Sequence, residues 1–191
     1  MWDAGPLRGR VATRGRTGAA LTAAMVCLAS CGGHQAGALK KKPQKKNVPV
    51  FDLRPGQCLV PPKANPNLQV ASIIVVSCRE PHTEEVYCVL PYAATLPDKA
   101  PPCPAEPSRL IGSPNQDYPG TQALETFANA VCLDEFQPYV GTTYQESALD
   151  YTYLYPSPRS WDAPSRRDRM VACILVSPRL ALTRSAKGSK L

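Results

Sequence analysis

The sequence lacks the features that mark metal, cofactor or catalytic sites. Only 2 of its 191 residues are histidine. It has no cysteine pair with the C-x₂-C spacing that is typical of structural zinc sites. No cofactor fingerprint and no internal repeat is found either. The sequence therefore predicts no metal and no cofactor.

The chain also lacks an apolar run long enough to span a bilayer, which takes about 20 residues. The apolar run near the start, residues 17–30, is shorter and follows Arg8, Arg10, Arg14 and Arg16. A positive start followed by a short apolar run is typical of an export signal. Because no two of these arginines are adjacent, twin-arginine export is not predicted.

The apolar run ends in Leu28-Ala29-Ser30-Cys31. A bacterial lipoprotein signal ends in this way, with small residues before a cysteine. We therefore predict a signal peptide over residues 1–30 and a diacylglyceryl group on Cys31, with fatty acids such as palmitate. Two acyl chains anchor stably where one does not, so the mature protein is expected on the outer face of the cell membrane. The alternative is a plain signal peptide with a chance cysteine.

The charge of the chain changes along its length. The whole chain carries a formal +7, whereas residues 50–183 hold 10 basic and 14 acidic side chains, a net charge of −4. A nucleic-acid-binding domain has its basic residues clustered on one folded face. The sequence therefore predicts no nucleic-acid partner.

Residues 31–49 are rich in lysine and have no apolar period. They predict a tether between the lipidated Cys31 and a domain over residues 50–191. Its lysines either rest on anionic lipid headgroups or form a solvated, self-repelling spacer.

Six cysteines lie beyond Cys27 and Cys31: Cys58, Cys78, Cys88, Cys103, Cys132 and Cys173. An even number in an exported chain predicts disulfides. Six cysteines allow 15 connectivities, and their spacing does not decide among them.

The pattern of apolar residues predicts strands over residues 70–76, 85–90, 150–155 and 170–176. The first of these is β-branched and continuous, so we expect it to be buried on both faces. Residues 91–119 hold eight prolines and predict a long irregular excursion. The expected fold is α+β, a small antiparallel sheet packed on one main helix and stapled by three disulfides.

The main helix is predicted over residues 121–138, with Thr121 as its N-cap and Pro138 and Gly141 at its end. Six residues share its apolar face: Leu124, Phe127, Ala128, Val131, Cys132 and Phe136. Three polar residues are expected to face away from the core: Glu125, Asn129 and Asp134.

Several motifs resemble the septum formation domain family. The first is Asp52-Leu53-Arg54-Pro55-Gly56-Gln57-Cys58-Leu59, and the most specific is C-x-x-P-H-x-x-E-V, formed by Cys78, Pro81, His82, Glu85 and Val86. A helical cysteine and aromatic, Cys132 and Phe136, and a closing pattern of Pro158, Trp161, Asp168, Arg169 and Cys173 also match. The chain departs from the family at Gln57 and Arg167, and Cys88 and Cys103 are additions.

The resemblance implies exported proteins and lipoproteins of the actinobacterial cell envelope, with a link to cell division. It also implies the disulfides Cys58–Cys78 and Cys132–Cys173, which leaves Cys88–Cys103. The expected function is a non-enzymatic binding module for an envelope protein or cell-wall partner. The alternatives are an envelope hydrolase using His82 and a carrier of lipids or small molecules beneath the proline-rich segment.

His82 is the only histidine of the predicted domain, since His34 lies in the tether. It is either a general base oriented by Glu84 or Glu85, a pH-sensing contact, or a structural residue of a turn. The structural role is favoured, because a base requires a nucleophile and an orienting group within reach. Asp168 and Arg169 are expected to form a local ion pair. The aromatic residues Trp161, Tyr151, Tyr153 and Tyr155 are expected in the core, with a ligand-binding face as the alternative.

Overall fold

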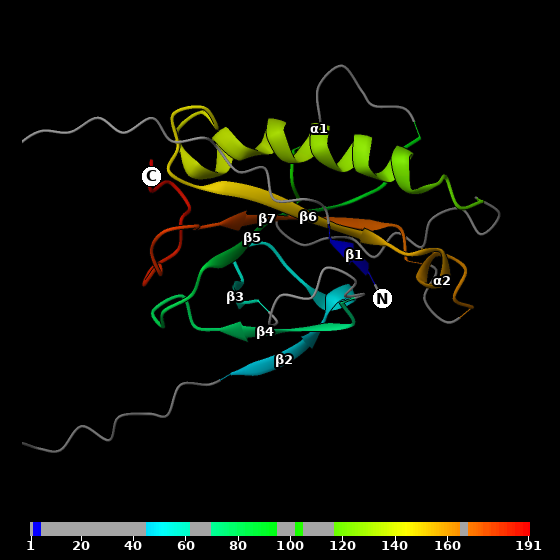
Figure 1. Cartoon of the computed structure of the whole chain (residues 1–191), viewed down its shortest axis with the longest axis horizontal. Coiled ribbons are helices and arrows are strands. Elements are labelled where there is room, and N and C mark those ends of the chain that lie inside the picture. Colours follow the sequence, from blue (N-terminus) through cyan, green and yellow to red (C-terminus); the bar gives the residue numbers. More distant parts are fainter. Residues whose placement is uncertain (1, 5–44, 62–69, 95–101, 105–116, 165–167) are drawn as a thin grey trace, which may run out of the picture. The chain divides into compact units, whose positions relative to one another are not determined.

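The computed structural model describes residues 2–4, 45–61, 70–94, 102–104, 117–164 and 168–191. These residues form a seven-stranded sheet in the order β1-β6-β7-β5-β3-β4-β2, in which every neighbouring pair is antiparallel (Figure 1). The strands are β1 (Trp2–Ala4), β2 (Lys46–Pro49), β3 (Cys58–Val60), β4 (Ser72–Val76), β5 (Glu84–Pro91), β6 (Asp150–Pro156) and β7 (Met170–Val176). The helices are α1 (Thr121–Val140), α2 (Pro158–Trp161) and the 3₁₀ turn η1 (Val50–Asp52).

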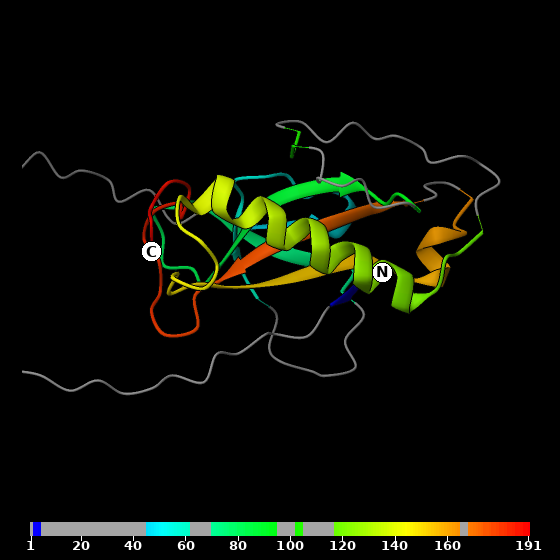
Figure 2. The same cartoon turned by 90° about the horizontal axis from the view of Figure 1, so that it is seen from above.

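Helix α1 lies across β5, β6 and β7 on one face of the sheet, as Figure 2 shows from above. Its buried side chains are the six predicted ones and, in addition, Val140. The helix begins at residue 121 and stops at Gly141 as predicted, but its N-cap and its last helical residue, Val140, differ from the prediction. Gly120, with φ of 91°, is the N-cap in place of Thr121. The helix continues through Pro138, because a proline in the last turn removes only one backbone hydrogen bond, and ends at Gly141 in the left-handed conformation.

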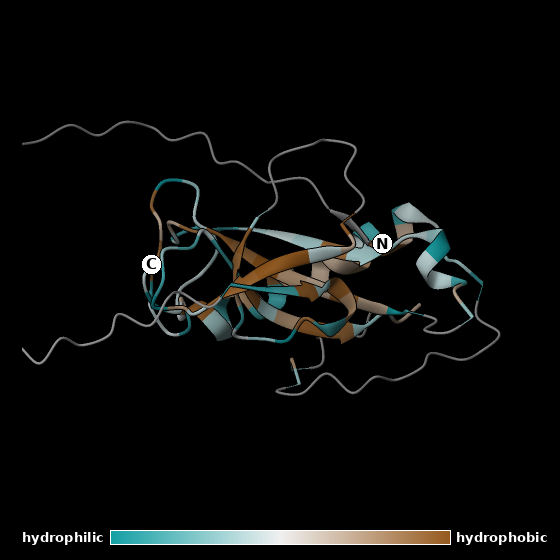
Figure 3. Cartoon of the chain, turned by 90° about the horizontal axis from the view of Figure 1, so that it is seen from below, coloured by the Kyte–Doolittle hydropathy of each residue, from teal (hydrophilic) through white to brown (hydrophobic). Residues whose placement is uncertain are grey.

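A bulge in β5 determines which side chains face α1. The register of β5 against β7 shifts between Val86 and Cys88, so Tyr87 is the extra residue of the strand. Tyr87 and Cys88 therefore both join the core beneath α1, whereas Val86 and Val89 join a second cluster on the other face. Figure 3 shows the hydrophobic colouring concentrated on the strands of the sheet.

The second cluster is closed by residues that follow β2, since Val50 and Leu53 are buried in it. Strand β2 forms from the last four residues of the predicted tether, and it pairs with β4. The expectation that residues 70–76 are buried on both faces was wrong: Ile74 is 38% exposed. The reason is the position of β4 near the end of the sheet, away from α1.

Three disulfides connect the elements: Cys58–Cys78, Cys88–Cys103 and Cys132–Cys173. The first joins β3 to the turn after β4, the second joins β5 to residues 102–104, and the third joins α1 to β7. These are the pairs that the family resemblance implied. The predicted fold class is confirmed.

The predicted lipidation site Cys31 lies outside the described residues, together with Cys27, His34 and most of segments 1–30 and 31–49. Most of the proline-rich segment 91–119 lies outside them as well. Among the residues that are described, no helix is long and apolar enough to cross a bilayer.

Candidate functional site

The C-x-x-P-H-x-x-E-V motif forms the turn between β4 and β5 and the first residues of β5. The turn is closed by the Glu80 amide, which donates to the Ser77 carbonyl at 2.8 Å. It is joined to the C-terminal segment by two backbone hydrogen bonds between His82 and Leu182, at 3.0 and 2.7 Å. The motif therefore connects two parts of the chain that are 100 residues apart.

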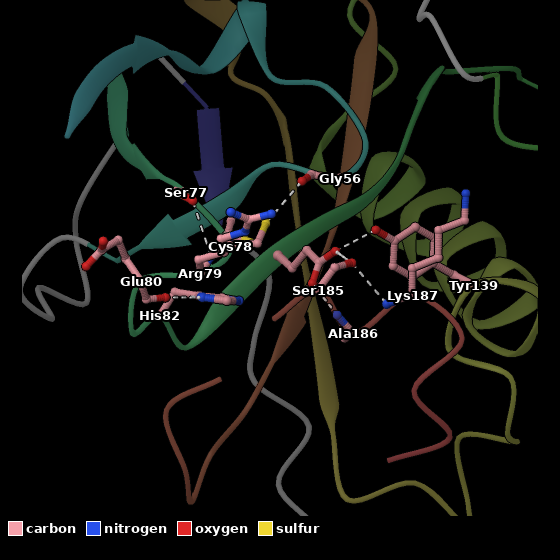
Figure 4. The surroundings of a disulfide bond; sticks show 12 residues. Gly56, Ser77, Cys78, Arg79, Glu80, His82, Tyr139, Ser185, Ala186 and Lys187 are labelled. Atoms are coloured by element: carbon pink, nitrogen blue, oxygen red, sulfur yellow. Dashed lines mark hydrogen bonds between the residues drawn. A yellow bond between two sulfur atoms is a disulfide. The ribbon is translucent and has the colours of Figure 1, made fainter. Parts of the chain in front are cut away.

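Glu85 is the fully buried centre of this region, with 0% of its surface exposed. One carboxylate oxygen accepts hydrogen bonds from the Tyr139 hydroxyl at 2.6 Å and the Ser185 hydroxyl at 2.5 Å. The other oxygen accepts the Ala186 backbone N–H at 2.7 Å (Figure 4). Burial, together with the hydrogen bond to Glu85, raises the pKa of Tyr139 well above its usual value, which keeps the phenol protonated. Glu85 thus fastens the C-terminal segment and the end of α1 to β5.

His82 is also buried, with 2% of its surface exposed. Its Nδ1 lies 2.8 Å from the Glu80 carbonyl oxygen, so Nδ1 carries the proton and donates it. Its Nε2 is buried and has no hydrogen-bond partner among the described residues. The sulfur of Cys58, a ring nitrogen of His82 and a carboxylate oxygen of Glu85 lie within 4.8 Å of one another.

This arrangement supports a structural role more than a hydrolytic one. The two hydroxyls that contact this pair, those of Ser185 and Tyr139, both donate to Glu85. Both oxygens of Glu85 are engaged by donors that hold the fold together. A serine hydrolase requires the histidine to take the proton of the nucleophile, and the described contacts provide no such hydrogen bond.

Glu84, the other acid considered as a partner of His82, points to the opposite face of the sheet. It is paired with Leu59 of β3, whereas Glu85 is paired with Cys58, and neighbouring strand residues face opposite sides. Desolvation by burial raises the pKa of Glu84 from 4.5 to about 7. Glu84 is therefore a carboxyl group that is costly to ionise in the folded state.

Replacing Glu84 by Gln is expected to flatten the pH dependence of stability. The folded carboxyl group holds its proton up to about pH 7, so its contribution to stability is complete below pH 4.5 and falls as the pH rises to 7. The loss amounts to about 3 kcal/mol. Urea unfolding at pH 4.5 and pH 8 measures it in the wild type and in Glu84→Gln, with Glu80→Gln, from the turn that precedes β5, as the control. A Glu84→Gln protein that keeps the wild-type difference between the two pH values would contradict this prediction.

The closing motif forms a second buried cluster around Trp161. The guanidinium of Arg169 lies 3.7 Å from the centroid of the Trp161 ring, and its Nη1 donates to the carbonyls of Trp161 and Asp168. Asp168 accepts the Met170 amide at 3.1 Å. Cation–π stacking and these hydrogen bonds fix the segment that leads into β7, which is a structural use of the motif residues.

The tyrosines of β6 belong to the core, as expected. Their hydroxyls reach the flank of α1: Tyr151 donates to Asn129 at 2.9 Å and Tyr155 donates to Glu125 at 3.0 Å. The prediction that Glu125 and Asn129 face away from the core was therefore wrong. Both are half-buried acceptors at the seam between helix and sheet.

An open hollow of about 420 Å³ lies between the end of β5 and the start of α1. Its walls include Tyr92, Pro119, Gln122 and Phe127. A carrier buries most of its ligand in an enclosed pocket, and the described residues form an open surface here.

The described residues contain two groups of potential metal ligands, and every cysteine in them is oxidised. Cys58 lies with His82 and Glu85, and Cys88 lies with Cys103 and Glu135. A thiolate is the form of cysteine that binds a metal. With the disulfides closed, these groups do not fit a metal ion.

Sequence reasoning identified Glu85 but not the groups that bind it. Tyr139 and Ser185 are 54 and 100 residues away along the chain. No local pattern in the sequence signals that either side chain contacts Glu85.

A family model described as septum formation matches residues 55–187. This range includes His82, Glu85, the Trp161 cluster and all six disulfide-bonded cysteines. No curated protein and no solved structure matches the chain.

Proposed function

Since the chain belongs to the septum formation family, we propose that it is an envelope lipoprotein that acts in septum formation as a non-enzymatic binding module. The family is not a known enzyme family, and its description relates the domain to septum formation or division. The proposed mature protein begins at the lipidated Cys31, so its sheet lacks β1, which lies in the predicted signal peptide. It presents its disulfide-bonded domain to an envelope protein or to the cell wall.

The observation that carries the proposal is the internal use of the motif residues. Glu85 holds the C-terminal segment through three hydrogen bonds. Arg169 is stacked on Trp161 within the core. Residues that serve a reaction must reach a substrate, whereas these residues contact their own chain. The motif residues therefore stabilise the fold, and contacts with a partner are left to residues on the surface of the domain.

The disulfides agree with the proposed location. Three disulfides within one domain are typical of oxidising compartments outside the cytoplasm. A disulfide-bonded domain that is anchored by lipid is expected to act at the outer face of the membrane that holds its anchor.

Replacing Cys31 by Ala is expected to abolish incorporation of a labelled palmitate analogue. Cys31 supplies the thiol that takes the diacylglyceryl group, and no other cysteine stands in the required position after Ala29-Ser30. The matched control is Cys27→Ala, which removes a cysteine from the same apolar run and should keep the label. Label that persists in Cys31→Ala would exclude lipidation at this position.

The role in septum formation is tested by complementation in the source organism. Deletion of the gene should disturb the spacing or completion of septa, scored by fluorescence microscopy of membrane-stained cells. The wild-type chain and Cys27→Ala should restore septation, and Cys31→Ala should not. Normal septation in the deletion strain would refute the proposed role.

A further inference from the structure

The Cys58–Cys78 disulfide differs from the other two disulfides in its surroundings. Cys58 is completely buried and Cys78 is half-buried, so the bond has one inner and one outer sulfur. The outer cysteine stands at the start of the exposed turn between β4 and β5. An attacking thiol therefore reaches Cys78 first, and Cys58 is the leaving group.

A histidine nitrogen that accepts no hydrogen bond belongs to a ring close to the Cys58 sulfur. Nε2 of His82 is buried and unpartnered, and its ring lies within 4.8 Å of the Cys58 sulfur. Nδ1 already donates to Glu80, which leaves Nε2 with a bare lone pair. In the disulfide the sulfur has no hydrogen to offer, whereas a Cys58 thiol would have one.

The Cys78 sulfur also lies close to a hydrogen-bond acceptor. The Cys78 sulfur lies 3.5 Å from the carbonyl oxygen of Gly56 (Figure 4). A Cys78 thiol can donate to that oxygen, and the disulfide sulfur cannot. Reduction therefore gives each sulfur a hydrogen to donate. The Gly56 carbonyl is the neighbouring acceptor of Cys78, and the His82 ring, whose free acceptor is Nε2, lies within 4.8 Å of Cys58.

We propose that Cys58–Cys78 is a redox-responsive bond, reduced and re-formed by thiol exchange with a vicinal dithiol, with His82 as the residue that stabilises the reduced state. This modification goes beyond the proposed septal role and does not depend on it. The domain is then the target of a dithiol and not a catalyst itself.

The exchange takes place in two steps, one at each sulfur of the disulfide. A thiolate of the dithiol attacks the Cys78 sulfur, the Cys58–Cys78 bond breaks, and Cys58 leaves as a thiolate. That thiolate takes up the proton that the dithiol released to solvent, and the resulting Cys58 thiol donates it to the lone pair of His82 Nε2. The second thiolate of the dithiol then attacks the sulfur joined to Cys78, which releases Cys78 and closes the dithiol to a disulfide. Two electrons and two protons pass to the cysteine pair.

The chain contains its own matched control in Cys88–Cys103. This disulfide also joins a buried cysteine to a half-buried one, and it closes a loop of similar length, 15 residues against 20. A carboxylate lies near each bond, that of Glu135 beside Cys88 and Cys103 and that of Glu85 beside Cys58, so a negative charge opposes formation of a thiolate at both disulfides. Access, loop length and a neighbouring carboxylate are matched, so His82 is the difference between the two bonds.

The test is a titration of the full chain, purified in detergent, with reduced and oxidised dithiothreitol. Free thiols are trapped by alkylation and quantified for each cysteine by peptide mass spectrometry. Cys58–Cys78 should be reduced first, with an equilibrium constant about tenfold in favour of the reduced state relative to Cys88–Cys103, as one satisfied buried acceptor corresponds to about that factor. Equal reduction of the two bonds, or earlier reduction of Cys88–Cys103, would overturn the proposal.

Two substitutions separate the redox role of His82 from its structural role. His82→Asn keeps a donor near the position of Nδ1 and removes the Nε2 acceptor, and His82→Gln keeps an acceptor near the position of Nε2. His82→Asn should shift Cys58–Cys78 toward the disulfide by about tenfold, and His82→Gln should shift it less, with Cys88–Cys103 unchanged in both. An unchanged equilibrium in a folded His82→Asn protein, or the same shift in both disulfides, would show that His82 is structural only.

Discussion

Replacing Glu85 by Ala is expected to lower the free energy of unfolding by roughly 3 to 6 kcal/mol. The substitution leaves three donors without their acceptor: the hydroxyls of Tyr139 and Ser185 and the amide of Ala186. Each unsatisfied buried donor costs about 1–3 kcal/mol. The total is limited because the C-terminal segment can detach and its donors can then bind water.

Urea unfolding followed by circular dichroism measures the loss, and hydrogen exchange locates it. The amides of residues 182–190, which include the bonds of Gly188 to Tyr139 and of Lys190 to Val140, should lose protection first. Glu135→Ala is the matched control, because within the described part of the chain that carboxylate accepts one N–H, from Cys103, and its loss should cost about 1 kcal/mol. A Glu85→Ala loss no larger than that of the control would contradict the role of Glu85 as the fastening of the C-terminal segment.

The main helix could be predicted from the sequence because its evidence is local. Apolar residues at a 3.6-residue spacing indicate which face of a helix is buried, whatever that face contacts. The six predicted positions from Leu124 to Phe136 are all buried. The polar flank was misread for the same reason: local spacing shows that Glu125 and Asn129 are off the apolar stripe, but not that tyrosines of β6 donate to them.

The sheet was predicted where its strands are long and apolar and missed where they are short or polar. β3 has three residues, and β2 begins in the lysine-rich segment. Both strands form by pairing with β4. This pairing is a tertiary interaction, so it leaves no periodic pattern in the sequence. The bulge at Tyr87 is equally invisible in the sequence, because an alternating pattern assumes a regular register.

At the candidate site, too, local features could be predicted from the sequence and tertiary contacts could not. The motif around His82 and Glu85 was recognisable as a motif, and a structural role for the histidine was the favoured expectation. What the motif contacts depends on Ser185 and Tyr139, which are distant in sequence and unremarkable in type. The unpartnered Nε2 beside a disulfide is a property of the folded chain, and it is the observation from which the redox proposal begins.

The second large effect concerns the disulfide between α1 and β7. Replacing Cys132 and Cys173 together by Ala should lower the free energy of unfolding by about 4 kcal/mol, since the bond closes a loop of 41 residues. Both cysteines are completely buried, so the lost sulfur atoms also leave a small void beneath the helix. For a domain of this size, the melting temperature should fall by about 10 °C or more.

The matched comparison is Cys88→Ala with Cys103→Ala. Its loop of 15 residues corresponds to about 3 kcal/mol, and Cys103 is half-buried, so its removal opens less of a void. Calorimetry under oxidising conditions should therefore rank the Cys132/Cys173 variant as the less stable of the two. An unchanged melting temperature in that variant would mean that the core beneath α1 holds the helix without its covalent link. The Phe136 and Tyr87 rings that meet there edge to face would then account for its attachment to the sheet.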